Sequence, residues 1–145
     1  MSKSISDIEQ EIVEEFSLFD DWMDKYQYII EMGQSLPTIP DTHKTEDNIV
    51  HGCQSQVWLL ADDQNGQIHY QADSDAVITK GLIALLIRVL SNHPAEDILK
   101  TDMGFVDRIG IRDHLSPNRS NGLNAMIKQM KIYALAYQAK AQQNK

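Results

Sequence analysis

The sequence predicts an α+β fold, in which helices pack around an antiparallel hairpin. Near both ends of the chain, apolar residues recur at the three-to-four-residue spacing of amphipathic helices. Between them the spacing changes to the two-residue alternation of strands, on either side of an Asn-Gly pair typical of a tight turn. With 145 residues the chain has the size of one domain. The expected parts of this domain (1–145) are N-terminal helices at 5–35, a sheet at about 49–74 and a helical remainder at 75–142.

The chain is predicted to open with two helices. Apolar residues recur at near-helical spacing over residues 8–19 and again over 22–30. Gly33 is expected to end the second helix, because glycine is common just after a helix C-terminus. The next stretch, 36–48, has two prolines and many turn-forming residues, so it is predicted to be a loop.

The hairpin pattern also predicts which residues face each other. A two-residue turn at 65–66 places Ala61 opposite Tyr70, and Leu59 opposite Ala72. In the second strand apolar residues alternate with polar ones, which leaves one face of that strand for solvent.

Helices are predicted for most of the rest of the chain. The stretch 76–90 is nearly all apolar, so a helix there must lie in the core. Asp73 and Asp75 are expected to cap the N-terminus of that helix. A short helix is expected after Pro94, and residues 116–120 lead into a last helix with an apolar face.

The composition argues against several classes of partner. Thirteen basic and 21 acidic residues give a net charge of −8. An acidic surface repels phosphate backbones and anionic lipid headgroups, so we expect neither nucleic acid nor a membrane as a partner. The N-terminal stretch is too acidic for a signal or transit peptide, and the longest apolar run (81–87) is far shorter than the ~20 residues of a membrane span. We therefore expect a cytoplasmic protein.

The only cysteine, Cys53, is the main candidate for chemistry. It lies in GCQSQVW (52–58), between a glycine and a run of uncharged polar residues, which is unusual company for a thiol that merely fills the core. A second interpretation is a metal ligand together with His51, which shares a face with Cys53 in extended backbone. The other histidines have no spacing that completes such a site, so no metal is expected. A third interpretation is a Cys–His nucleophile.

Four segments together resemble the SufE family of sulfur-acceptor proteins. They occur in the family's order over about residues 20–130, and they are DWMDKYQYIIEMGQSLP (21–37), GCQSQVW (52–58), DSDAVITKGLIALLI (73–87) and LSPNRSNGLNAMI (115–127). The resemblance implies a compact α+β domain with a small antiparallel sheet flanked by helices, similar to the IscU-type iron–sulfur scaffolds. Those scaffolds use several cysteines, so this chain should share their fold without assembling a cluster.

The resemblance also implies a function. A SufE protein takes persulfide sulfur from a pyridoxal-phosphate (PLP) cysteine desulfurase of the SufS type, stimulates that desulfurase, and delivers the sulfur to the SufBCD scaffold. The chain would then be a carrier and not an enzyme by itself, with PLP held by the partner and no cofactor of its own. Cys53 is the implied acceptor. Gly52, Gln54 and Gln56 match the family's loop residues, and Arg119 matches an arginine near the partner surface. We expect a monomer.

Other functions stay open at this point. A CsdE-like acceptor for a CsdA-type desulfurase would carry the same motifs. A stand-alone cysteine-dependent hydrolase or transferase would turn over without any desulfurase and would depend on a histidine. In an interaction module, Cys53 would only pack and would resist alkylation.

Overall fold

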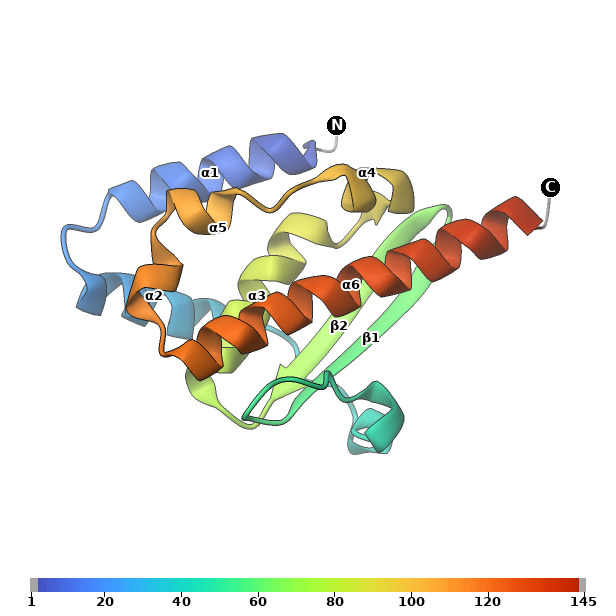
Figure 1. Ribbon diagram of the computed structural model, residues 1–145, viewed down its shortest axis with the longest axis horizontal. Coiled ribbons are helices and arrows are strands. Elements are labelled where there is room, and N and C mark those ends of the chain that lie inside the picture. The colour runs from blue at the N-terminus through green and yellow to red at the C-terminus, as the bar shows by residue number, and fades with distance from the viewer. Residues whose placement is uncertain (1–2, 144–145) are drawn as a thin grey trace.

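The computed structural model describes residues 3–143 and shows an α+β fold, as predicted (Figure 1). The helices are α1 (Ile5–Ser17), α2 (Trp22–Gln34), α3 (Val77–Leu90), α4 (Ala95–Lys100), α5 (Phe105–Arg108) and α6 (Pro117–Gln143). The strands are β1 (Val57–Gln64), β2 (Gln67–Ser74) and β3 (His93–Pro94), which form an antiparallel sheet in the order β1-β2-β3. Short 3-10 turns lie at Asp41–His43, Glu46–Asn48 and Ile111–His114.

The predicted hairpin is confirmed, including its register. Ala61 pairs with Tyr70 and Leu59 pairs with Ala72. The turn at residues 65–66 has φ angles of 56° and 86°, and positive φ at both positions is what a type I′ turn requires. Glycine and asparagine adopt this conformation at little cost, so the local sequence alone sets the pairing of the two strands.

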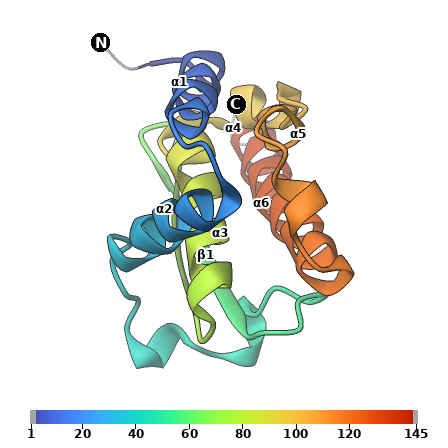
Figure 2. The same ribbon diagram turned by 90° about the vertical axis from the view of Figure 1, so that its left-hand side faces the viewer.

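Helix α3 lies at the centre of the fold and packs on β2 and α2 (Figure 2). Ten of its 14 residues are buried, which explains why its sequence is apolar nearly all round. The prediction that Gly33 ends α2 is wrong, because Gly33 is buried within α2. A Cβ atom on Gly33 would lie 2.7 Å from the backbone nitrogen of Gly81 in α3. Glycine is therefore needed there for the close crossing of two helices.

The predicted capping of α3 by Asp73 and Asp75 is also wrong. The N-cap residue is Ala76, and no side chain caps it. Asp73 is buried and forms ion pairs with Lys44 at 3.2 Å and Lys80 at 3.3 Å. The Asp73 carboxylate is thus bound by two lysines, and the Asp75 carboxylate accepts from the Gln56 N–H at 3.0 Å.

The sheet ends its hairpin at Ser74 as predicted, but it differs from the predicted range of 49–74 in its start and in having a third strand. Regular pairing begins at Val57, and Ile49 contributes only an isolated bridge to Trp58. A third strand, β3, pairs with the first two residues of β2 and interrupts the predicted helical remainder. A strand of two residues has no alternating pattern for the sequence to reveal. The short helix expected after Pro94 is present as α4.

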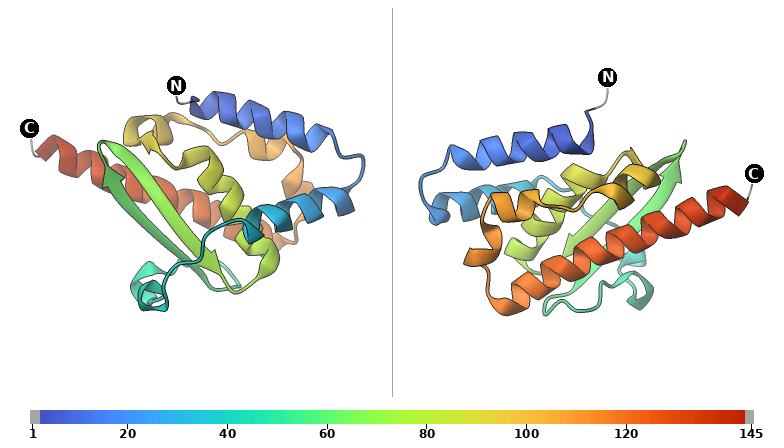
Figure 3. Two further views of the ribbon diagram at one scale, coloured as in Figure 1. Left: turned by 180° about the vertical axis from the view of Figure 1, so that it is seen from behind. Right: turned by 45° about the horizontal axis from the view of Figure 1, so that its top comes forward.

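Helix α6 runs along the hairpin and ties the C-terminal part of the chain to the sheet (Figures 1 and 3). The Tyr70 hydroxyl donates a hydrogen bond to the Met130 carbonyl at 2.6 Å, and the Tyr137 hydroxyl donates to the Ala61 carbonyl at 2.8 Å. Among residues 3–143, no helix combines the length and the apolar character that crossing a membrane requires.

Candidate functional site

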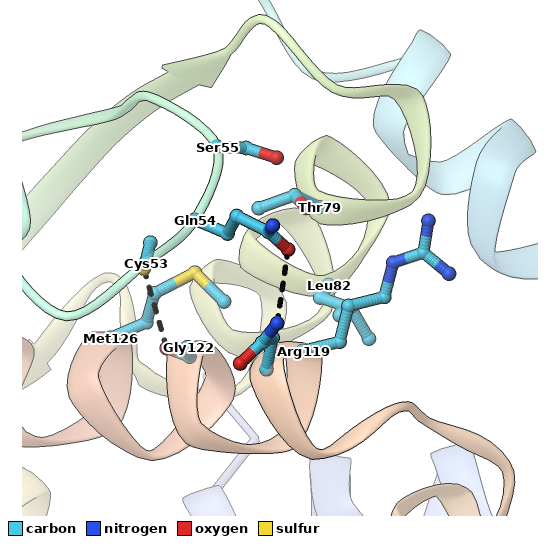
Figure 4. Close-up of a pocket in the computed structure, with 9 residues that line it drawn as sticks. Cys53, Gln54, Ser55, Thr79, Leu82, Arg119, Gly122 and Met126 are labelled. Atoms are coloured by element: carbon cyan, nitrogen blue, oxygen red, sulfur yellow. Dashed lines mark hydrogen bonds between the residues drawn. The ribbon is translucent and has the colours of Figure 1, made fainter.

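The site forms where three segments meet: the loop that leads into β1, the first turns of α3 and the first turns of α6 (Figure 4). We call residues 51–56, which follow the buried Val50 and lead into β1, the cysteine loop. A cavity of about 100 Å³ separates the three segments. Thr79 and Leu82 line it from α3, Met126 lines it from α6, and Cys53 lines it from the cysteine loop.

The Cys53 thiol is half-buried and rests against α6. Its sulfur donates a hydrogen bond to the Gly122 carbonyl oxygen at 3.6 Å. Burial raises the pKa of the Cys53 thiol, because a thiolate would lose solvation there. At neutral pH the resting cysteine is therefore the protonated thiol.

The polar stretch 52–56 is fixed at one end by the backbone conformation of Gly52 and at the other by hydrogen bonds of Gln56. Gly52 has φ of 98°, a conformation that strains any residue with a side chain, so the sharp bend before Cys53 requires glycine. Gln56 is anchored at the start of α3, where its backbone N–H donates to Asp75 Oδ1 at 3.0 Å. Its carbonyl oxygen accepts from the Asp75 N–H at 3.2 Å and from the Ser74 hydroxyl at 2.8 Å.

Gln54 and Arg119 lie at the rim of the cavity. The side-chain oxygen of Gln54 accepts a hydrogen bond from the Asn118 amide at 3.3 Å, which links the loop to the first turn of α6. Arg119 is exposed, and its guanidinium points away from the Cys53 sulfur (Figure 4). In this arrangement the arginine does not act on the thiol, and its charge faces solvent.

Residues 10–134 match the protein-family model described as "SufE: Fe-S metabolism associated domain". The chain belongs to the SufE family. An uncharacterized SufE-like protein of Rhizobium meliloti (strain 1021) is 37% identical over 86% of this chain and 92% of its own length. A second one, from Rhizobium etli, is 39% identical over 83% of this chain and 85% of its own length.

A plant protein is similar to this chain in sequence, and a bacterial protein of known structure is similar to it in fold. SufE-like protein 1, chloroplastic/mitochondrial, of Arabidopsis thaliana is 40% identical over 93% of this chain, which spans 37% of that longer protein. The solution structure of a hypothetical protein from Thermus thermophilus is 22% identical and superimposes with a TM-score of 0.74, covering 89% of this chain and 94% of that one. This last match shows a shared fold.

The candidate site contains residues that sequence reasoning did not single out. Gly122 lies directly under the Cys53 sulfur, and Thr79 and Leu82 form the α3 wall of the cavity. The predicted site residues Gly52, Cys53, Gln54 and Arg119 all lie at or beside the cavity, whereas Gln56 acts through its backbone at the start of α3. His51 is exposed. Within residues 3–143, no group of three or more His, Cys, Asp or Glu side chains is arranged to hold a metal ion.

Proposed function

We propose that this protein accepts sulfur on Cys53 from the persulfide of a cysteine desulfurase and carries it to an iron–sulfur scaffold. The observation that supports this most directly is the placement of the only cysteine, on a loop over a cavity at the surface of a SufE-family fold. One thiol is sufficient for this task. A second thiol nearby would attack a persulfide on Cys53 and release sulfide too early.

The transfer is a thiol exchange without net oxidation. The Cys53 thiolate attacks the terminal sulfur of the donor's persulfide, and a new sulfur–sulfur bond forms as the donor's own sulfur–sulfur bond breaks. The donor cysteine leaves as a thiolate and takes up a proton. PLP is needed only to generate the donor's persulfide, so we assign it to the partner and no cofactor to this chain.

We assign the donor to the SufS type and the scaffold to the SufBCD type. By draining the donor's persulfide, the carrier would speed a desulfurase without being an enzyme itself. A CsdA-type donor is the alternative within the family. The two are separated by comparing how strongly this protein stimulates each desulfurase.

The cysteine loop must change position for the transfer to occur. At rest the thiol is half-buried and protonated, whereas the exchange needs an accessible thiolate. We propose that Gly52 serves as the hinge, and that Gln54 and Gln56 shape the loop. Arg119, exposed at the rim of the cavity, is proposed to contact the donor.

The cavity has room for the transferred sulfur. A water molecule needs only about 10–15 Å³ of such space, and the cavity has about 100 Å³. Leu82 and Met126 supply apolar walls, which would keep water and small thiols away from a persulfide on Cys53.

The stand-alone hydrolase is a weaker candidate because of the state of the thiol. An activated cysteine nucleophile has a lowered pKa, usually through a neighbouring histidine or another cation. The Cys53 sulfur instead donates to the Gly122 carbonyl, no histidine within residues 3–143 lines the cavity, and burial raises the pKa of the thiol.

An intact-mass measurement tests the proposal. The protein is mixed with a SufS-type desulfurase and cysteine, without a reductant. We expect Cys53 to gain one or more sulfur atoms, a reducing thiol to remove them, and the folded Cys53→Ser variant to gain none. If neither a SufS-type nor a CsdA-type desulfurase of proven activity loads the protein, or if Cys53→Ser is loaded equally, the proposal is wrong.

A further inference from the structure

We infer that Gly122 is the docking position for the resting Cys53 thiol, and that the size of the residue at 122 sets how often the cysteine loop releases it. Gly122 is thus a positioning residue for the sulfur acceptor. The biological meaning of this inference rests on the proposed function, but the docking itself does not.

The cysteine loop packs closely against α6 at this point, with room for a methyl group and little more. A Cβ atom on Gly122 would lie 3.4 Å from the Cys53 sulfur and 3.8 Å from the Cα and Cβ atoms of Cys53. A methyl group would therefore just touch the thiol, and a branched side chain would overlap it. On the loop side, a Cβ atom on Gly52 would lie 3.2 Å from the Cβ atom of Ala125, so small residues meet on both sides of the contact.

The backbone of Gly122 does not require glycine. Gly122 lies within α6 and is not among the glycines with positive φ, which are Gly52, Gly66 and Gly110. Within a helix glycine is less favourable than alanine. The atom that a side chain at 122 would meet first is the Cys53 sulfur, which also donates its hydrogen bond to the Gly122 carbonyl (Figure 4).

A larger residue at 122 would act on the thiol and leave the rest of the loop in place. The bonds from Gln56 to Asp75 and from Gln54 to Asn118 lie outside the contact with Gly122. Displaced from its seat, the Cys53 thiol would be solvated and would ionise more easily. The same displacement would expose a persulfide on Cys53 to reducing thiols.

The test measures the rate of alkylation of Cys53 by iodoacetamide as a function of pH, with no desulfurase present. It compares the native protein with Gly122→Ala and Gly122→Val, because valine is no worse than glycine within a helix. Asn121→Ala, an exposed neighbour on α6, is the matched control. We expect Gly122→Ala to react at pH 8 at close to the native rate, because its methyl group fits. Gly122→Val should react on the order of tenfold faster, since tenfold more thiolate corresponds to one pH unit in the titration midpoint.

The possible outcomes distinguish docking of the Cys53 thiol on Gly122 from the transfer of sulfur to Cys53. The inference is overturned if folded Gly122→Val is alkylated at the native rate with the native pH profile, if it is alkylated more slowly, or if Asn121→Ala changes the rate as much. Thermal unfolding of each variant shows whether the comparison is made on folded protein. Faster alkylation of Gly122→Val combined with no sulfur uptake by the native protein in the intact-mass measurement would support docking and overturn the proposed function.

Discussion

The surroundings of Cys53 favour storage of a thiol over its reaction. The rate of thiol exchange depends on the fraction of thiolate, and burial keeps that fraction low in the resting loop. Among the described residues that line the cavity, Arg119 is the one cation, and its guanidinium points away from the sulfur (Figure 4). Within residues 3–143 no carboxylate forms an ion pair with Arg119, so its charge is available to a partner.

Replacement of Arg119 by alanine tests this role. We expect sulfur transfer from the desulfurase to slow by about tenfold, which corresponds to about 1.4 kcal/mol and is typical of one lost hydrogen bond to a charged group. Stability should change by less than about 0.5 kcal/mol, because the residue is exposed. The measurement is the rate of persulfide formation at several desulfurase concentrations. Lys128→Ala, which removes an exposed charge further along α6, is the control. Equal effects of the two variants would show that only net charge matters.

At the scale of elements, the sequence predicted the hairpin, whereas the helix ends at Gly33 and at Asp73 and Asp75 were predicted wrongly because contacts between elements decide them. The Asn-Gly turn and the alternation around it determine the hairpin by themselves, so even the pairing of Ala61 with Tyr70 could be predicted. The loop motif likewise singled out Cys53, which the structure places at the cavity. Gly33 could not be understood in this way, because it is explained by Gly81, far along the chain, which packs against it. The contact of Gly122 with Cys53 also joins residues far apart in the sequence.

The crossing of α2 and α3 gives a prediction at this scale. In Gly81→Ala the new Cβ atom would lie 2.6 Å from Cγ2 of Ile29 and would also overlap the Ile29 carbonyl oxygen. The Ile29 carbonyl belongs to the backbone of α2 and cannot move aside as the end of a flexible side chain can. We therefore expect a loss of about 2–3 kcal/mol in the free energy of unfolding. Urea unfolding followed by circular dichroism measures it. Gly122→Ala, also within a helix, should cost little or nothing, and a loss as large as that of Gly81→Ala would contradict this account.

Across the whole molecule, the site lies at the edge of a continuous core. The buried residues of α1, α3, α6 and the sheet form one hydrophobic cluster, and Cys53 packs against its surface. The hydrogen bonds described for residues 52–56 join the loop to the starts of α3 and α6. The loop can therefore detach while the core stays folded, in the manner of a local opening.

This separation of the loop from the core predicts how urea affects Cys53. Local opening exposes little surface, so the alkylation rate of the native protein should be nearly constant between zero and about 1 M urea, where the fold persists. If the thiol became accessible only through global unfolding, the free energy of unfolding would fall by about 1–3 kcal/mol per molar urea, and the rate would rise by more than about fivefold. Alkylation and circular dichroism in the same urea series distinguish the two cases. A rate that follows global unfolding would mean that the cysteine loop is a rigid part of the core, and that a desulfurase would have to unfold the site before it could transfer sulfur.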